Sequence, residues 1–515
     1  MGEFRAWCVP GVEEEGGVGR PSGGGASGAG GAVVEAGAGG GGALRLRCLE
    51  LDAPAMGRIV ARLRGARRGL LERPVDEIAQ RLGRVGLRFL DGGDPVRARA
   101  LELLPPGVGI SGPMAVAIVD GMAADWTPER LLGLLRAEFG DPAVLDRLVD
   151  RNGGGGTVPA RPGGSERGAR SMGARAGSPG AGRIRALGAA LAVHLSSGTV
   201  PGVSVTSLVR SLLVKSPVLL KPGRGDVVLP VLFLEALAAE DPELAAAAAV
   251  IYWPGGEGEA EAAALEAADL VVVYGSDGVV AAVRRRLGPH VPMVAYHHRV
   301  SAALVGREAL RPGPLEAAAR QAARAVALFD QRGCVSPRVV WVEEGGEVGP
   351  RDFARALTRA LARLEEELPS GVLNDVEASA LQQLRGTAEL REAAGEDFAV
   401  WAGGDAPWTV VYEGGPGVEG GAAGGRLVRV RGVPDALDLG DRLAPLAPHL
   451  QTVAVCGLGG RIDAVAEHLA RAGAGRIASL DGAPWPPPWW HHDGRGPLQA
   501  LVRWVDVEEG AGGGR

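Results

Sequence analysis

The 515-residue chain has almost no lysine: of its 55 basic residues only Lys215 and Lys221 are lysine, which leaves 55 − 2 = 53 arginines. A P-loop needs a lysine directly after a glycine, in the pattern GxxxxGK[ST]. Neither lysine follows a glycine, so a P-loop is excluded. Lysine is a compact point charge on a slim stem, whereas arginine is a wide planar fork. We therefore expect the two lysines to mark positions where arginine does not fit.

Cysteine, long apolar runs and an excess of one charge are scarce as well. The four cysteines form no CxxC pair, which argues against a disulfide framework and a zinc ribbon. No apolar run reaches the ~18 residues of a membrane span, and no signal segment is recognisable. The net charge is only −6, which argues against a broad nucleic-acid surface. These absences predict a soluble cytoplasmic protein with no metal site.

Glycine is abundant instead, and its 83 residues gather in tracts that divide the chain. We predict a flexible Gly-rich tail over residues 1–43 and a Gly/Ser/Pro-rich linker over 151–182. Between them, residues 44–150 carry apolar residues at three- and four-residue steps, the period of helices. Two further domains are expected over residues 183–330 and 331–515.

Residues 183–330 alternate between strand and helix patterns. Near-continuous apolar segments at 218–222, 247–253, 270–276 and 292–298 are separated by helical segments. Such strands are typical of a parallel sheet that is covered by helices on both faces. The fold class predicted is therefore α/β and doubly wound, with ligands bound at the carboxyl ends of the strands.

Candidate ligand-binding residues follow these strands. Lys221 ends the first of these strands. Arg224 could bind a phosphate through its bidentate guanidinium, and a solvated loop cation is at least as good an interpretation of this residue. Gly275 and Ser276 open a helix whose free N–H groups attract an anion. The alternative for Ser276 is an ordinary helix N-cap.

Cys334 is the candidate nucleophile, in the segment FDQRGCVSPRVVWV. A nearby cation such as Arg332, or the backbone amides around Gly333, would favour its thiolate. The alternative is a small buried apolar residue, which is our interpretation of Cys8 in the tail and of the other two cysteines.

The string FDQRGCVSPR resembles the active-site segment of the aldehyde dehydrogenase superfamily. It is closer still to the fatty acyl-CoA reductases of the bacterial bioluminescence type, in which DQ-x-x-C-x-S-P is characteristic. Residues 198–222 resemble the segment that lines the nicotinamide end of the cofactor, and 271–280 resemble the turn that receives its pyrophosphate. LQTVAV and the closing WHHDG-x-x-PL are also similar. The resemblance covers residues 45–510 apart from the glycine tracts.

The resemblance implies an aldehyde-dehydrogenase-like fold: a Rossmann-like cofactor domain beside a second α/β domain that bears the cysteine, with the N-terminal helices packed against them. It implies that Thr199, with the backbone N–H of Cys334, supports the oxyanion. Lys221 would bind the adenosine ribose and Arg224 a 2′-phosphate, which favours NADP, with NAD as the other possibility. Either His298 or His297 would supply a proton, and the alternative is a structural histidine at the end of a strand.

The chain departs from the dehydrogenases at two places. They have asparagine where Thr199 stands, and they carry a general-base glutamate upstream of the cysteine, where residues 294–301 (VAYHHRVS) contain no carboxylate. Without that base, water is poorly activated and an acyl-cysteine is not hydrolysed efficiently. The departure favours a reductase.

We therefore expect an NADPH-dependent acyl-CoA reductase that forms an aldehyde through an acyl-cysteine. The acyl donor would be acyl-CoA or an acyl-protein, with an acyl-protein synthetase as partner, and the enzyme a homo-oligomer. The alternatives are an aldehyde dehydrogenase or an acyl-phosphate reductase on the same fold, and a non-catalytic scaffold.

Two further motifs are interpreted as structural. GLGGRI (457–462) lacks the third glycine of a dinucleotide fingerprint and indicates a turn. The cluster at 491–493 (HHD) has no second ligand set for a metal, and its place in the family-like closing segment predicts packing near the mouth of the active site.

Overall fold

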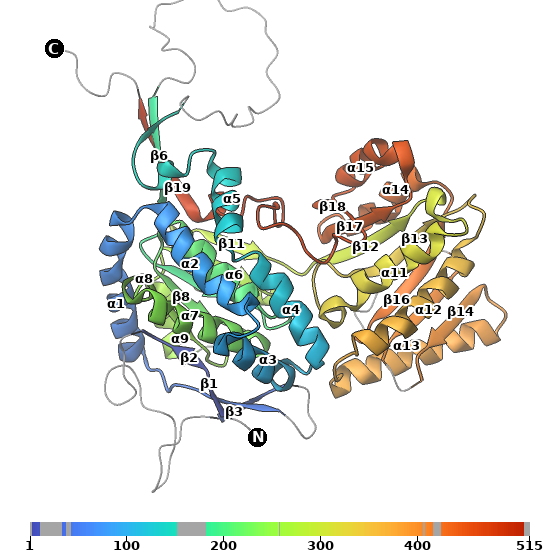
Figure 1. The fold of residues 1–515 in the computed structure, drawn as a ribbon, viewed down its shortest axis with the longest axis horizontal. Helices are drawn as coiled ribbons and strands as arrows, with labels where there is room; N and C mark the ends of the chain where they lie inside the picture. The colour runs from blue at the N-terminus through green and yellow to red at the C-terminus, as the bar shows by residue number, and fades with distance from the viewer. Residues whose placement is uncertain are drawn as a thin grey trace, which may run out of the picture.

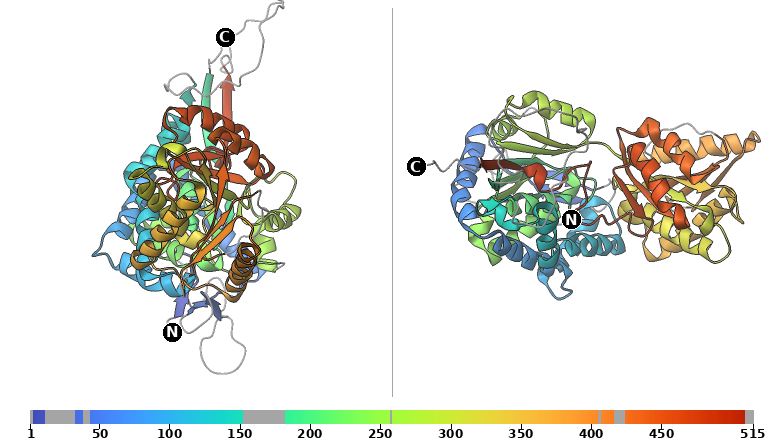
Figure 2. Two further views of the ribbon diagram at one scale, coloured as in Figure 1. Left: turned by 90° about the vertical axis from the view of Figure 1, so that its right-hand side faces the viewer. Right: turned by 90° about the horizontal axis from the view of Figure 1, so that it is seen from above.

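The computed structural model describes residues 3–10, 33–37, 43–151, 182–256, 258–404, 407–415 and 424–508. Two sheets organise the described residues, one of six strands and one of seven. Each lies at the centre of its own lobe, as the views from the side and from above show (Figures 1 and 2). Two short three-stranded sheets extend the first lobe at two ends: the sheet of β1 (Glu3–Arg5), β4 (Leu44–Arg47) and β3 (Val33–Ala36) is mixed, and the sheet of β19 (Val502–Glu508), β6 (Gly182–Gly188) and β5 (Val149–Asp150) is antiparallel.

The first lobe contains a Rossmann-like sheet with the strand order β11-β10-β7-β8-β9-β2. Its strands are β2 (Trp7–Cys8), β7 (Ala192–Leu195), β8 (Val218–Lys221), β9 (Ala248–Ile251), β10 (Leu270–Tyr274) and β11 (Met293–Tyr296). All pairs are parallel except the edge pair of β2 with β9. After β7 the next two strands, β8 and β9, are added on one side of β7, and the following strands, β10 and β11, are added on its other side. Ligands bind at such a switch point, here between β7 and β10.

Helices cover both faces of this sheet, as the apolar strands predicted. The connections are α6 (Val203–Leu213), α7 (Val228–Glu240), α9 (Glu259–Glu266) and α10 (Asp277–Arg286). The predicted N-terminal helical segment is confirmed by α1 (Ala53–Glu72), α2 (Val75–Leu90), α3 (Pro95–Val108), α4 (Gly112–Ala124) and α5 (Pro128–Phe139). Among the described residues no single helix is long and apolar enough to cross a membrane. By length and composition alone, α3 and α4 would pass that test as a pair, with a 119° bend between them.

The N-terminal helices join the sheet through a core of three large aromatic rings. Phe89 of α2, Trp126 and Phe233 of α7 have ring centroids 5.7 to 6.1 Å apart. The close approach of α2 depends on Gly86, where a Cβ atom would lie 2.3 Å from the carbonyl oxygen of Trp126. Any side chain at this position would separate α2 from the start of α5.

The second lobe has the strand order β14-β15-β16-β13-β12-β17-β18. Its strands are β12 (Val300–Val305), β13 (Pro337–Glu343), β14 (Phe398–Ala402), β15 (Thr409–Glu413), β16 (Leu427–Val433), β17 (Leu450–Cys456) and β18 (Arg476–Ser479). On one face pack α11 (Pro314–Ala327) and α12 (Pro350–Glu367). On the other pack α14 (Leu439–Leu443) and α15 (Ile462–Arg471), while α13 (Asp375–Ala393) covers the β14 end.

The sheets divide the chain differently from the predicted boundary at residue 330. β12 already belongs to the second sheet, so the second lobe begins at Val300. At the other end, β19 (Val502–Glu508) returns to the first lobe, where it pairs with β6 (Gly182–Gly188), and β6 pairs with β5 (Val149–Asp150) (Figure 1). Residues 331–515 are therefore not one domain, because sequence periodicity does not show which sheet a strand joins.

Part of the predicted flexible tail is ordered. Residues 3–10 contain β1 (Glu3–Arg5) and β2, and residues 33–37 contain β3 (Val33–Ala36), which pairs with β4 (Leu44–Arg47). Phe4, Trp7 and Cys8 are buried there, so the prediction is wrong for these segments. Their apolar side chains pack in the first lobe despite the surrounding glycines. The rest of the predicted tail, and residues 152–181 of the predicted linker, lie outside the described residues.

The structure shows why position 215 holds a lysine and not an arginine. Its side chain is buried, with 1% of the residue exposed, and its backbone is left-handed with φ = 60°. The ammonium donates to the carbonyl oxygens of Leu71 (3.3 Å) and Arg73 (2.5 Å) and pairs with Asp146 (2.5 Å). These carbonyls are at the end of α1, where a cation is favourable. A compact charge fits this site, and a planar fork would not.

We predict that Lys215→Arg lowers the free energy of unfolding by about 1–3 kcal/mol, because the larger guanidinium overpacks the site. Lys215→Met should cost about 3 kcal/mol, because it leaves Asp146 without its cation and two carbonyls without their donor. Urea denaturation measures both effects. Arg68→Lys, on the exposed face of α1, is the matched control and should change little. A Lys215→Arg protein as stable as the parent would contradict this account.

Candidate functional site

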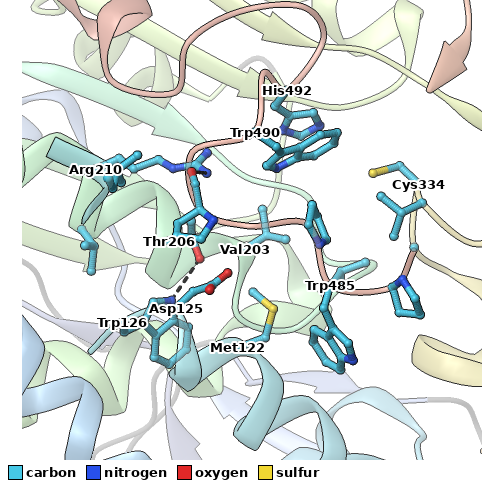
Figure 3. A pocket seen from close by; sticks show the side chains of 18 of the residues that line it. Met122, Asp125, Trp126, Val203, Thr206, Arg210, Cys334, Trp485, Trp490 and His492 are labelled. Carbon is cyan, nitrogen blue, oxygen red and sulfur yellow. Dashed lines mark hydrogen bonds between the residues drawn. The ribbon is translucent and has the colours of Figure 1, made fainter. Parts of the chain in front are cut away.

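A cavity of about 140 Å³ lies beside Cys334. It is formed by the α4–α5 corner, by α6, by the turn before β13 and by the segment 484–492 (Figure 3). Its lining is mostly apolar or aromatic: Met122, Trp126, Leu131, Leu134, Val200, Val203, Val209, Phe329, Val335, Trp485 and Trp490. A concave apolar site with a few polar groups is typical of a small-molecule pocket.

Cys334 stands on a strained turn between α11 and β13. The three residues Phe329, Asp330 and Gln331 have φ values of 57°, 49° and 60°. For residues other than glycine this left-handed conformation costs on the order of 1 kcal/mol or more each, and it persists only where its surroundings enforce it. The turn places Gly333 and Cys334 at the wall of the cavity.

Side chains from distant parts of the second lobe enforce this turn. Asp330 accepts hydrogen bonds from Nε and Nη2 of Arg426 (3.1 and 2.8 Å), and both residues are buried. The Gln331 amide donates to the carbonyl oxygens of Pro337 (2.9 Å) and Leu427 (2.5 Å). The FDQ string before the cysteine is therefore a structural requirement of the turn.

Arg332 does not assist the thiol as the sequence predicted. Its guanidinium donates to the carbonyl oxygens of Val108 (3.1 Å) and Val372 (3.3 Å) and pairs with Glu377 (3.4 Å). The prediction was wrong because proximity in sequence does not determine the direction of a side chain. Arg332 instead fastens the Cys334 turn to the end of α3.

Cys334 is half-buried as a residue, and its thiol lies in a desolvated environment. Burial raises its pKa to about 11, and the negative charge of Asp493 acts in the same direction. A hydrogen bond from Gln451 and the positive charge of Arg299 oppose this rise in pKa. At neutral pH the free thiol is therefore protonated, and Gln451 and Arg299 stabilise the thiolate when it forms.

Asp493 is a carboxylate near the sulfur that sequence reasoning missed. Residues 294–301 contain no carboxylate, but the carboxylate of Asp493, in the C-terminal segment, lies close enough to the Cys334 sulfur to raise its pKa. One carboxylate oxygen accepts from Gln451 Nε2 (3.0 Å), and the other pairs with Arg299 Nη2 (2.9 Å). Both oxygens are engaged, which makes Asp493 a poor base for activating water.

Four stacked rings form one side of the site. Trp490, His492, Tyr296 and Tyr274 follow one another with centroids 4.6, 4.4 and 4.5 Å apart and planes inclined by 20–24°. Burial lowers the pKa of His492 to about 4, so its imidazole is neutral. The predicted packing of this segment near the active site agrees with the position of His492 at the cavity. The described residues contain no cluster that would hold a metal ion.

His297 and His298 lie outside the cavity lining. Both are exposed at the end of β11. The Nδ1 atom of His297 lies 3.0 Å from an Asp277 carboxylate oxygen, and the carbonyl oxygen of His298 is 3.3 Å from Nδ1 of His449. Among the histidines of the described residues, His492 lines the cavity.

Thr199 lies in the loop between β7 and α6, at the switch point of the first sheet. It is exposed, and its hydroxyl is 3.0 Å from the Ser197 hydroxyl. Its neighbours Val200 and Val203 line the cavity, whereas Thr199 itself does not. Thr199 as a direct support for the oxyanion therefore stays a prediction.

The predicted cofactor-binding residues gather at the carboxyl edge of the first sheet. Lys221 ends β8, with its ammonium 5.9 Å from the centroid of the Tyr252 ring, and burial lowers its pKa. Arg224 is exposed in the next turn. Gly275 follows β10, and the Ser276 hydroxyl accepts from the amide of α10 at its third residue, 3.4 Å away. Ser276 is thus an N-cap, and its role towards a ligand stays a prediction.

Gly198, Gly223 and Gly225 allow the loop of Thr199 and the loop of Arg224 to pack closely against each other. A Cβ on Gly223 would lie 2.2 Å from the Gly198 nitrogen, and one on Gly225 would lie 2.2 Å from the Gly198 oxygen. Asp226, which sequence reasoning missed, accepts from the amides of Gly202 (2.7 Å) and Ser204 (2.8 Å) at the start of α6. The loop of Thr199, the loop of Arg224 and the start of α6 therefore form one unit.

Solved structures define the class of fold. An NAD-dependent aldehyde dehydrogenase from Sinorhizobium meliloti aligns with a TM-score of 0.68 at 16% identity, over 94% of this chain and 93% of that one. The putative aldehyde dehydrogenase PutA from Anabaena variabilis aligns with a TM-score of 0.64 at 18% identity, over 92% and 97%. The predicted aldehyde-dehydrogenase-like fold is confirmed.

Sequence comparison defines the family within this class. Residues 176–504 match the model of the family described as acyl-CoA reductase (LuxC), and the chain belongs to that family. The long-chain acyl-protein thioester reductase of Aliivibrio fischeri is 27% identical over 340 residues, and the long-chain acyl-protein thioester reductase 2 of Photobacterium leiognathi is 24% identical over 338. Each match spans 63% of this chain and 65% of the relative's length.

We predict that alkylation of Cys334 by iodoacetamide accelerates ~10-fold for each pH unit from about pH 7 to about pH 10, without a plateau, because the thiolate fraction rises until the pKa of about 11. Asp493→Asn removes a negative charge, so it should lower this pKa and increase the rate at pH 8. Peptide mass mapping identifies the site, and Asp481→Asn, an exposed residue, is the control. A plateau below about pH 9 in the parent protein would refute the assigned environment.

Proposed function

We propose that this protein reduces an acyl thioester to an aldehyde with NADPH, through an acyl intermediate on Cys334. The main support is the position of Cys334, on a turn held in the left-handed conformation at the wall of an apolar cavity. The relatives are named long-chain acyl-protein thioester reductases, which supports the thioester as the substrate class.

The groups at the edge of the first sheet fit a dinucleotide phosphate. They comprise the Lys221 ammonium, the Arg224 guanidinium and the N-terminus of α10 after Gly275 and Ser276. This is a set of anion-binding groups around the β7–β10 switch point. In the proposal Lys221 binds the ribose and Arg224 a 2′-phosphate, which favours NADP over NAD. When bound, NADPH supplies a hydride to the acyl carbon.

The residues of the site would act in a balanced sequence. The Cys334 sulfur bonds to the acyl carbon, the thioester bond breaks, and the thiol proton leaves with the departing thiol. The backbone N–H of Cys334, and the hydroxyl of Thr199, donate to the oxyanion. After hydride addition the thiohemiacetal alkoxide reforms a carbonyl and the carbon–sulfur bond breaks. The aldehyde departs, and the Cys334 thiolate takes a proton from solvent or through His298.

The surroundings of Cys334 protect the acyl-enzyme from water. The lining is largely apolar, and the Asp493 carboxylate is committed to Arg299 and Gln451. An aldehyde dehydrogenase must activate water at this stage, and it needs a free base to do so. The site therefore favours reduction over hydrolysis.

The proposal extends to the partners of the enzyme. The relatives' names support an acyl-protein as the donor besides acyl-CoA, and hence an acyl-protein synthetase as a partner. The sheet of β19, β6 and β5 projects from the first lobe (Figure 1), and exposed strands of this kind support a homo-oligomer. The described cysteines are all free, which supports a cytoplasmic location.

We predict that the parent protein, mixed with an acyl-CoA in the absence of NADPH, gains the mass of one acyl group on the peptide that contains Cys334. Cys334→Ala should lose both this adduct and at least ~10³-fold of the acyl-CoA-dependent NADPH oxidation, because no other group replaces the nucleophile. Cys456→Ser is the matched control, since Cys456 is partly exposed but outside the cavity lining. An adduct that survives in Cys334→Ala would overturn the proposal.

We predict that Arg224→Gln raises the KM for NADPH ~10–100-fold and leaves that for NADH within ~3-fold, because only NADPH carries the 2′-phosphate. Steady-state kinetics with both cofactors measure the difference. Arg285→Gln, in the last turn of α10, serves as the control. Equal effects on the two cofactors would show that Arg224 does not contact this phosphate.

A further inference from the structure

Arg210 of α6 is a charged residue in the wall of the apolar cavity. It is 7% exposed, and its side chain and Cys334 lie on opposite sides of the cavity (Figure 3). The guanidinium donates a long hydrogen bond from Nη2 to the carbonyl oxygen of Pro488 (3.3 Å), and it also hydrogen-bonds with the Tyr274 hydroxyl. Its buried Nε atom has no hydrogen-bond partner within the described part of the chain.

The other charged groups near the cavity are paired among themselves. Asp125, the carboxylate in the lining, accepts from Nη2 and Nε of Arg130 (2.9 and 3.2 Å). Asp493 is paired with Arg299. No ion pair of Arg210 occurs within the described residues. Asp125 acts on Arg210 only through its longer-range charge, because its carboxylate is already paired with Arg130.

The remaining polar neighbours of Arg210 are uncharged. His492 is neutral because burial lowers its pKa to about 4, and burial raises the pKa of Tyr274, which keeps its hydroxyl protonated. A buried guanidinium without a counter-charge is costly unless a bound anion completes the pair. The cavity therefore carries a net positive charge at the side opposite the sulfur.

We propose that Arg210 binds a carboxylate at the far end of the acyl group, so that the preferred substrates are thioesters of dicarboxylic acids. A carboxylate matches the two parallel donors of a guanidinium fork. The apolar side chains along the cavity, such as Val203 and Trp485, contact the methylene chain between the two ends. The product is an aldehyde that carries a carboxylate. This inference rests on the proposed function and specifies its substrate.

The experiment compares matched pairs of CoA thioesters: butyryl with succinyl, hexanoyl with adipoyl, and octanoyl with suberoyl. In at least one pair the parent protein should favour the dicarboxylic member by at least ~10-fold in kcat/KM, the size expected for a hydrogen bond to a charged group. Arg210→Met should reduce that ratio at least ~10-fold. Arg210→Lys should retain part of the preference, because it keeps the charge without the fork.

Arg136→Met is the matched control, since Arg136 is an exposed arginine on α5 outside the cavity lining. It should leave the ratio unchanged. A second measurement needs no turnover: calorimetry of free adipate and hexanoate, in which adipate should bind the parent more tightly and lose this advantage in Arg210→Met. The wild-type comparisons and Arg210→Lys decide the question even where Arg210→Met fails to fold.

Two results would overturn the inference: a parent protein that favours the dicarboxylic member by ~10-fold in none of the pairs, or a ratio unaltered in Arg210→Met. In the second case Arg210 serves only to hold the Pro488 carbonyl. Failure of the proposed function looks different, because then no thioester of either kind is reduced and Cys334 is not acylated.

Discussion

The buried ion pair between Asp330 and Arg426 is the constraint on which the site depends. Arg426 is 1% exposed and grips Asp330 through two nitrogens, while Glu365 accepts from its remaining side. Removal of one member of such a pair costs about 3–5 kcal/mol, because the other charge stays buried. That is comparable to the strain of three left-handed residues, at about 1–3 kcal/mol each. If the pair were broken, the turn would relax and Cys334 would leave the cavity wall.

Desolvation has two opposite consequences at Cys334. It raises the pKa of the thiol, which reduces the population of the nucleophile, and it deprives an acyl-cysteine of the water that would hydrolyse it. In the proposed reduction the protection from water outweighs the smaller thiolate population, because the thioester must survive until the hydride arrives. Gln451 and Arg299 limit the loss, since they stabilise the anion without providing a base. In the proposed reaction, the polar groups around the sulfur would therefore influence the outcome as well as the rate.

Sequence patterns predicted what depends on local periodicity and on strand ends. The strands and helices of the first lobe, the helical N-terminal segment, Cys334 and the residues after β8 and β10 lie where the patterns put them. The patterns failed where tertiary contacts decide. β19 pairs with β6, which lies more than three hundred residues earlier in the chain. Arg332 points away from the Cys334 thiol, whereas Asp493 approaches the thiol from the C-terminal segment. Such partners have no fixed spacing, so no local pattern reveals them.

Helix α6 connects the two halves of the site. Its start is held by Asp226, which belongs to the same turn as Arg224, and its residues Val203, Thr206 and Arg210 line the cavity. Thr206 is held in turn by the indole N–H of Trp126 (3.1 Å; Figure 3). Hydride transfer needs the donor and acceptor carbons within a few tenths of an ångström of their reactive separation. In the proposed reaction, α6 would help to meet this requirement, because one helix both lines the cavity and is held to the loops at the switch point.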